Sequence, residues 1–127
     1  MPTPDEIRTR LRHYIDRLCA GDTDAIAGLY ADDGWVEDPV GQPAHRGREA
    51  VRGFYAGTAG MLRAEIRGPV VVNGHTGVMT LLASLTLPGQ SPRWLDAVDI
   101  VEFDDDGQIV SLRAYWNPME MRDDAES

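Results

Sequence analysis

Three polar side chains, those of Tyr14, Asp38 and Asp99, are the candidates for chemistry in this sequence. Asp99 lies in Ala97-Val98-Asp99-Ile100-Val101, where apolar residues occupy both faces of the expected strand. Burying an ionised carboxylate is costly, and desolvation raises the pKa of such a group. Asp99 is therefore either a carboxyl group whose pKa is raised by an apolar setting, or an acid at a sheet edge or beside an arginine.

The other two candidates also allow a plain structural interpretation. Tyr14 shares the apolar face of an expected helix with Ile7, Leu11 and Leu18. A buried tyrosine needs a partner for its hydroxyl, so Tyr14 either forms a structural hydrogen bond or points into a cavity. Asp38 follows a short extended run and precedes a proline, where an aspartate either caps a turn or acts as an acid or base.

Whole classes of chemistry are excluded by what the chain lacks. All 12 basic residues are arginine, and without lysine there is no Schiff base and no phosphate-loop lysine. His13, His45 and His75 do not have the spacing of metal ligands, and Asp104-Asp105-Asp106-Gly107 lacks the later ligands of a calcium loop. We therefore expect no metal or organic cofactor, and chemistry carried by carboxylates and tyrosines in a cavity.

The composition describes one acidic domain spanning residues 1–127, long enough to bury its own core. With 21 acidic and 12 basic residues the net charge is −9, which disfavours nucleic acids and anionic membranes as partners. The single Cys19 excludes an internal disulfide and favours a reducing compartment. Because MPTPDEIRTR is no secretory signal and no apolar run could span a bilayer, we expect a cytoplasmic protein.

The elements that must position the candidate residues begin with three helices. A capping-box signature at 3–6 and a stop at Gly21 delimit the first helix. A second, shorter helix is expected from 22 or 23 to 31. After a short extended run at 35–38, a third helix is expected from about 47 to about 60.

The hydrophobic period then changes from about 3.6 residues to about 2. It predicts four strands, at 63–72, 78–87, 94–103 and 108–117, with Asn73-Gly74 as a hairpin turn. The acidic tail from about Glu120 to Ser127 is expected to fray. Helices followed by a meander of long strands predict an α+β fold, in which a curved sheet wraps around the helices and leaves a cavity between the layers.

Several separated segments share the pattern of one enzyme family. They are YADDGWVEDPVG at 30–41, Tyr14–Leu18 followed by Ala20-Gly21-Asp22, Phe54-Tyr55-Ala56, Val98-Asp99-Ile100 and Val110–Ala114. Over nearly the whole chain they closely resemble the bacterial Δ5-3-ketosteroid isomerases. The resemblance implies a fold similar to nuclear transport factor 2, a conical α+β barrel with a curved mixed or antiparallel sheet around three helices, and it implies a homodimer.

The resemblance also implies roles for individual residues. Asp38 falls on the family's general base, and Tyr14 and Asp99 fall on its two oxyanion-hole donors. Tyr55, and beyond it Tyr30, fall on hydroxyls that hydrogen-bond toward the catalytic tyrosine. In this family a carboxylate removes a proton beside a ketone while two donors, one of them a protonated aspartate, stabilise the dienolate oxygen without a cofactor.

The remaining apolar pattern suits a flat, hydrophobic ligand such as a ketosteroid. On the last expected strand four side chains alternate onto one face: Val110, Leu112, Ala114 and Trp116. With Phe54 and Val101 they are candidate pocket walls, although each alone is more often plain core. Trp116 also falls on an aromatic pocket position of the family.

Two departures from the family pattern concern the shape of the pocket mouth. Trp35 is bulkier than the residue expected before Val36-Glu37-Asp38-Pro39, and the turn at 87–94 carries two prolines and an extra tryptophan. Both features bear on which substrate fits the pocket more than on which reaction takes place. Two other functions stay under consideration: a polyketide cyclase or dehydratase on the same fold, and a non-catalytic carrier, which an Asp99 paired with an arginine would favour.

Overall fold

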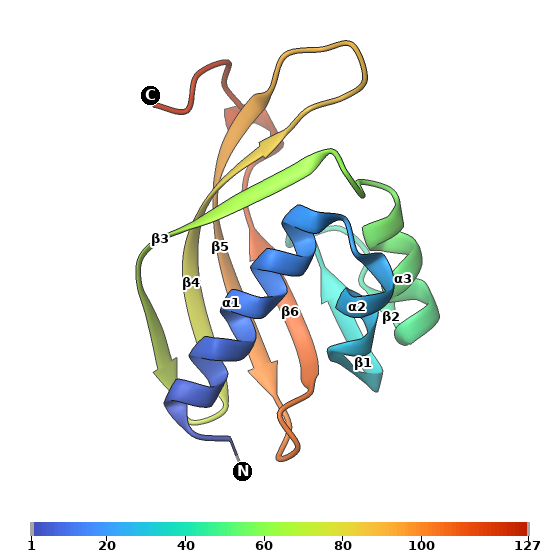
Figure 1. Cartoon of the computed structure of the whole chain (residues 1–127), viewed down its shortest axis with the longest axis vertical. Helices are drawn as coiled ribbons and strands as arrows, with labels where there is room; N and C mark the ends of the chain where they lie inside the picture. Colours follow the sequence, from blue (N-terminus) through green and yellow to red (C-terminus); the bar gives the residue numbers. More distant parts are fainter. Residues whose placement is uncertain (1, 127) are drawn as a thin grey trace.

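The computed structural model describes residues 2–126, which form three α-helices, one sheet and a short 3-10 turn (Figure 1). The helices are α1 (Pro4–Ala20), α2 (Thr23–Gly28) and α3 (Arg48–Ala56). The strands are β1 (Tyr30–Glu37), β2 (His45–Arg46), β3 (Leu62–Asn73), β4 (Thr76–Leu85), β5 (Arg93–Phe103) and β6 (Ile109–Tyr115), and the turn is η1 (Pro118–Glu120). No helix in this part of the chain is long and apolar enough to cross a membrane.

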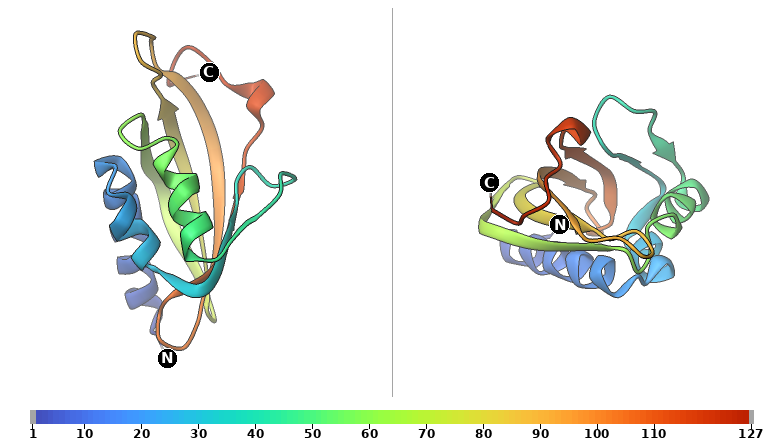
Figure 2. Two further views of the ribbon diagram at one scale, coloured as in Figure 1. Left: turned by 90° about the vertical axis from the view of Figure 1, so that its right-hand side faces the viewer. Right: turned by 90° about the horizontal axis from the view of Figure 1, so that it is seen from above.

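The strands form one mixed sheet in the order β2-β1-β6-β5-β4-β3. β1 runs parallel to β6, and every other neighbouring pair is antiparallel. The helices lie on one face of the sheet, and the long strands bend around them (Figure 2). Alternate side chains of these strands therefore face the helical layer and build the core. The predicted α+β class, with a curved mixed sheet around three helices, is confirmed.

The first helix forms where its local signals predict it. Thr3 Oγ1 accepts a hydrogen bond from the Glu6 N–H, and Glu6 Oε1 accepts one from the Thr3 N–H, both at 3.2 Å, so the capping box is present. Gly21 ends the helix in the left-handed conformation at φ 68°. The face between these caps buries Ile7, Leu11, Tyr14, Ile15 and Leu18. Packing of this face determines where Tyr14 points.

Pairing with a distant strand corrects the predicted second helix. It ends at Gly28 and not at residue 31, because Tyr30 already begins β1 and pairs with Ile109 of β6. The Ile109 N–H donates to the Leu29 carbonyl at 2.9 Å, which secures this start. Other boundaries also differ from the prediction: β1 begins at Tyr30 and not at 35, α3 ends at Ala56 and not near 60, and β6 ends at Tyr115 and not at 117. The strand predicted at 78–87 is β4 at 76–85, and the remaining predicted strand ends differ by at most one residue.

The segment after β6 packs against the sheet, so the expectation of a frayed tail from residue 120 is wrong for its first residues. The Trp94 N–H donates to the Arg122 carbonyl at 2.7 Å, and the Arg122 N–H donates to the Trp94 carbonyl at 2.9 Å. The Arg122 guanidinium also binds both carboxylate oxygens of Asp96, at 2.9 and 3.2 Å. Acidity and a terminal position favour fraying, but these contacts with β5 outweigh them.

Candidate active site

An apolar cavity of about 210 Å³ lies between the helices and the inner face of the sheet. Its lining consists mainly of leucine and alanine side chains from β3, β4 and β5, closed by aromatic residues of α3 and the end of β6. Four ionisable side chains interrupt this lining: Tyr14, Asp38, Tyr55 and Asp99. The structure therefore brings together, in one cavity, residues that lie far apart in the sequence.

Asp99 is the most unusual group in the cavity, since only 4% of the residue is exposed to solvent. It lies on β5, an interior strand between β4 and β6, and not at a sheet edge. Within residues 2–126 it forms no salt bridge with any arginine. Burial, and then the negative charge of Asp38, raise the pKa of Asp99 to about 8. At neutral pH its carboxyl group is mostly protonated and can donate a hydrogen bond.

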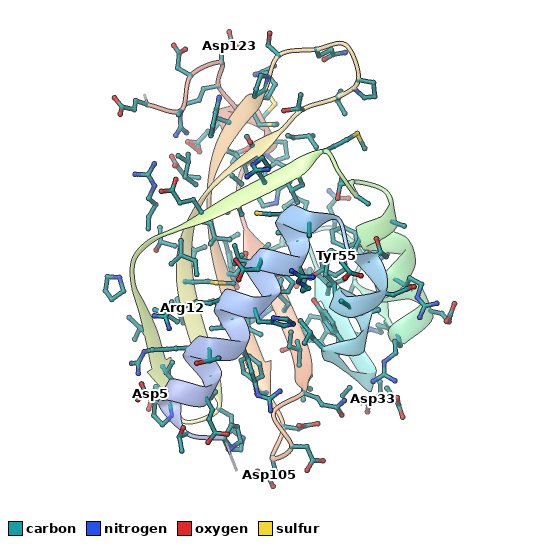
Figure 3. The ribbon with its side chains drawn as sticks, in the orientation of Figure 1. Asp5, Arg12, Asp33, Tyr55, Asp105 and Asp123 are labelled. Atoms are coloured by element: carbon teal, nitrogen blue, oxygen red, sulfur yellow. The ribbon has the colours of Figure 1, made fainter. Side chains whose placement is uncertain are left out.

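Three buried tyrosines form a continuous chain of hydroxyls that ends in the cavity. The Tyr14 and Tyr55 hydroxyl oxygens are 2.9 Å apart, and the Tyr55 and Tyr30 hydroxyl oxygens are 2.6 Å apart. Tyr55, labelled in Figure 3, projects from α3 and links α1 to β1. Burial raises the pKa of all three hydroxyls well above 10.0, so all three keep their protons. Three protons serve two hydrogen bonds, so one proton is left over, and it lies on Tyr14 if Tyr30 donates to Tyr55 and Tyr55 donates to Tyr14.

Asp38 lies just beyond β1, at the cavity wall. The Trp116 indole N–H donates to its Oδ1 at 2.6 Å, a bond across the sheet from β1 to the end of β6. Burial raises the pKa of Asp38, while this hydrogen bond and the charge of His45 act to lower it. Asp38 therefore has a hydrogen-bond donor that favours its ionised form, whereas Asp99 owes its raised pKa to burial and to Asp38.

Of the six candidate wall residues, Phe54, Ala114 and Trp116 line the cavity, whereas Val110, Val101 and Leu112 do not. The ring of His45 stacks behind Phe54 with centroids 4.9 Å apart. Val101 and Leu112 face the same side of the sheet but lie outside the cavity wall, in fully buried positions facing each other on β5 and β6. The structure thus places Val101 and Leu112 in the closed core, and a direct ligand contact is not available to them.

Sequence reasoning missed two features of the site. Met121 lines the cavity, although it belongs to a segment expected to fray. The hydrogen bond between Trp116 and Asp38 joins residues 78 positions apart, and no local pattern signals it. The only available hint for Met121 was an apolar side chain within an otherwise polar tail.

The arrangement suits removal of a proton beside a carbonyl group. Asp38 supplies a carboxylate base, and Tyr14 and protonated Asp99 supply two donors on which negative charge at a carbonyl oxygen could be stabilised. The apolar lining excludes water and strengthens such hydrogen bonds. Within the described residues, no group of three or more His, Cys, Asp or Glu side chains is arranged to hold a metal ion.

Comparison with known proteins identifies relatives over most of the chain. Residues 11–112 match the family model for the SnoaL-like domain. The chain is 37% identical over 117 residues to a steroid Delta-isomerase of Nocardioides simplex, an alignment that covers 91% of this chain and 94% of the relative.

Other relatives carry a different activity in their names. The chain is 29% identical over 139 residues to epoxide hydrolase LasB of Streptomyces lasalocidi, covering 91% of this chain and only 49% of that longer protein. Among solved structures, the epoxide hydrolase/cyclase-like enzyme SalBIII superimposes with a TM-score of 0.86 at 24% identity, covering 95% of this chain and 98% of that one. This last similarity establishes the shared fold.

Proposed function

The chain belongs to the SnoaL-like domain family, and we propose that within this family it is a cofactor-independent isomerase of 3-ketosteroids. The reaction moves a ring double bond from the β,γ to the α,β position relative to the ketone. The observation that carries the proposal is Asp99, a carboxyl group whose burial raises its pKa to about 8, in the same cavity as the carboxylate of Asp38. The 37% identity to a steroid Delta-isomerase supports it.

The proposed reaction is a proton transfer within one substrate molecule. Asp38 removes a proton from the carbon between the ketone and the double bond, and the electron pair moves onto the carbonyl oxygen to give a dienolate. Tyr14 and Asp99 donate hydrogen bonds to that oxygen as its charge develops. Asp38 then returns the proton to the far carbon of the former double bond, which regenerates the ketone and the carboxylate.

The tyrosine chain supports Tyr14 as a donor. When Tyr30 donates to Tyr55 and Tyr55 donates to Tyr14, the Tyr14 proton is left for the substrate oxygen. Each hydrogen bond polarises the next, so the chain stabilises negative charge better than one isolated hydroxyl. The oxygen–oxygen distances of 2.6 and 2.9 Å place all three hydroxyls within hydrogen-bond reach of their neighbours.

A second candidate function is the opening of an epoxide or a related cyclisation, favoured by the 29% identity to an epoxide hydrolase. A protonated acid and a carboxylate in one cavity could protonate an epoxide oxygen and activate a nucleophile. The apolar lining of the cavity and the high coverage of the isomerase relative favour the first candidate. A carrier role is less consistent with Asp99, which has no arginine partner within residues 2–126.

The deciding experiment follows the absorbance of the conjugated enone product. Purified protein is mixed with a β,γ-unsaturated 3-ketosteroid, and the Asp38→Asn variant is measured in parallel. We expect rapid growth of the absorbance with the wild type and a loss of at least about 100-fold in the variant, which has no base. A flat wild-type trace with measurable steroid binding would favour a carrier, and a flat trace without binding would favour the epoxide or cyclase chemistry.

We also propose that the protein forms a homodimer through the outer face of its sheet. All three α-helices lie on the opposite face (Figure 2), and on this face Thr80 and Tyr115 are exposed. Paired residues of β4, β5 and β6 line up across it: Val78, Ile100 and Arg113 in one row, and Thr80, Val98 and Tyr115 in the next. We call these six residues the outer patch.

A further inference from the structure

The segment Asn117–Arg122, here called the C-terminal strap, pairs with the edge of β5 beyond the point where β6 ends. β6 pairs with β5 only as far as Tyr115 opposite Val98, so β6 leaves the first residues of β5, before Val98, without a partner on that side. The strap turns back through η1, and Arg122 exchanges two backbone hydrogen bonds with Trp94, at 2.7 and 2.9 Å. In Figure 2 the strap lies over the end of the molecule that is remote from the chain start.

Several side chains hold the strap in this position. The two-pronged contact from Arg122 to Asp96 joins the strap to β5, at 2.9 and 3.2 Å. Arg93 donates to the Met121 carbonyl at 3.1 Å. At the start of the strap, the Asn117 side chain accepts from the Met119 N–H at 2.9 Å. Because Met121 and Arg122 are tied to β5 and the Asn117 side chain fixes the turn of η1, the strap can act as a fixed wall.

Its two methionines point in opposite directions. Met121 lines the cavity together with Leu95 and Trp116, whereas Met119 is 90% exposed. The strap also borders a second, polar chamber, which shares Leu95 and Trp116 with the cavity and is otherwise lined by Asp96, Asn117, Glu120 and Arg122. Met121 thus faces the apolar cavity from a strap whose Asn117, Glu120 and Arg122 side chains border a polar one.

Met121 lies far from the reacting groups. Asp99 and Leu95 face the same cavity from β5 and are four residues apart, which corresponds to about 13 Å along a strand. Since Arg122 pairs with Trp94, Met121 lies at the Leu95 end. A rigid, elongated ligand whose carbonyl lies at Asp99 and Tyr14 would therefore place its opposite end against the strap.

We propose that the C-terminal strap selects the substituent at the end of the steroid farthest from the reacting ketone, with Met121 as the specificity-determining residue. The inference rests on the proposed isomerase function. A compact substituent packs against the Met121 side chain. A larger one needs the space that this side chain occupies, and beyond it the polar chamber.

The test compares two substrates that are identical except at this far end. One carries a single ketone oxygen on the last ring, and the other carries a two-carbon acetyl group there. For Met121→Ala we expect the ratio of kcat/KM values to move about tenfold toward the acetyl substrate, mostly through KM, as removed bulk in an apolar pocket does. Met119→Ala removes the same side chain from the exposed side of the strap and should leave the ratio unchanged. Met121→Leu, which conserves volume, should restore the wild-type preference.

Equilibrium binding separates this inference from the proposed function. Binding of the two conjugated products is measured by tryptophan fluorescence, since Trp116 lines the cavity. A change in the binding preference of Met121→Ala without any turnover would support the strap and refute the isomerase. Normal turnover with an equal ratio in Met121→Ala and Met119→Ala would refute the strap alone. If the wild type binds neither product, both proposals fail.

Discussion

At the scale of single residues, the two aspartates of the cavity differ in what surrounds them. Burial raises the pKa of Asp38, but the hydrogen bond from the Trp116 indole and the charge of His45 oppose this rise and favour its ionised form. Asp99 is almost fully buried, and the charge of Asp38 further favours its protonated form. One cavity therefore holds a base and an acid built from the same residue type, which is how environment assigns opposite roles to chemically identical groups.

The pKa of Asp99 predicts how activity depends on pH. Activity should fall as the pH rises through about 8, because ionised Asp99 can no longer donate a hydrogen bond. Asp99→Asn keeps a donor and has no proton to lose, so its pH profile should lack this fall. Asp99→Leu removes the donor and should cost about 100- to 1000-fold in kcat. Rate profiles of the three proteins check this, and full activity in Asp99→Leu would contradict the assignment.

The same shift predicts a pH dependence of stability. The pKa of Asp99 is higher in the folded chain, about 8, than its ordinary value of 3.8. The folded state therefore holds a proton that the unfolded state releases, and this stabilising contribution is fully present below 3.8 and is lost as the pH rises to about 8. Urea unfolding of wild type and Asp99→Asn from pH 4 to pH 9 would detect it as a decline that is larger in the wild type than in the variant, where the raised pKa of Asp38 still contributes.

Trp116 should act on the base through its N–H group. A hydrogen bond to a charged group is worth about 1.5–3 kcal/mol, so Trp116→Phe should destabilise ionised Asp38 and raise its pKa. The acidic limb of the kcat/KM profile should then move to higher pH, while the aromatic cavity wall is kept. Trp94→Phe is the matched control, since the Trp94 side chain does not line the cavity. An unchanged acidic limb in Trp116→Phe would show that the indole only fills space.

At this scale the sequence identifies which residues belong to the site better than it identifies the residues that they contact. Asp99 and Tyr14 could be identified because a polar group within an apolar period is informative even without a structure. Met121 could not, because its cavity position depends on a backbone pairing between Arg122 and Trp94, 28 residues away. Alternation along the strands correctly places Val101 and Leu112 on the inner face of the sheet. It does not show how far along each strand the cavity extends.

At the scale of elements, α1 owes its position to a glycine on β4. A Cβ atom at Gly77 would lie 2.6 Å from Leu11 Cδ1 and 3.2 Å from Ile7 Cγ2, so the helix and strand meet where no side chain separates them. Leu11 and Ile7 are both fully buried. The contact lies one turn before Tyr14, so it helps to hold that hydroxyl against Tyr55.

Gly77→Ala should therefore destabilise the protein by about 1–3 kcal/mol, as overpacking of a filled core does. It should also lower kcat, because a displaced α1 moves Tyr14. Gly53→Ala is the matched control, since Gly53 lies in α3 with no atom within 4 Å of the added Cβ. That variant should gain about 0.5–1 kcal/mol from a better helix former. Equal effects of both variants in thermal unfolding would contradict the close-packing argument.

The element boundaries were predictable where the signal is local. The capping box and Gly21 predict both ends of α1 because capping involves residues within one helical turn. The end of α2 and the start of β1 are set by pairing with β6, nearly 80 residues later, and the helical spacing of Leu29 and Tyr30 gives the opposite indication. The short β2 depends wholly on its pairing with β1 and has no pattern of its own.

At the scale of the whole molecule, the cavity results from covering only one face of a curved sheet. The helices fill part of the inner space, and the strap closes the end that they leave open. The layers were predictable from the order of helices and strands. The closure of the cavity was not predictable, because it needs the segment after β6 to return to β5. In Figure 3, Asp123 marks the end of the molecule where the strap lies, and Asp105 marks the opposite end.

The uncovered outer face leads to the prediction about assembly. Its outer patch contains Val78, Val98 and Ile100, half-buried within the monomer, and Tyr115, which is 41% exposed. Burying such a face in a second copy would remove apolar surface from water. The net charge of −9 on each chain opposes this, so association should strengthen with added salt.

Light scattering coupled to size exclusion should give twice the 14.0 kDa mass of one chain for the wild type. Ile100→Glu places a charge at the centre of the outer patch and should yield the monomer, because an unpaired charge buried in an interface is costly. Leu87→Glu changes an exposed apolar residue in the loop after β4 and should stay dimeric. A wild type that is monomeric at high salt, or an Ile100→Glu variant that keeps the double mass, would place the interface elsewhere. Since a single chain already forms the cavity, the monomeric variant should still bind the steroid product.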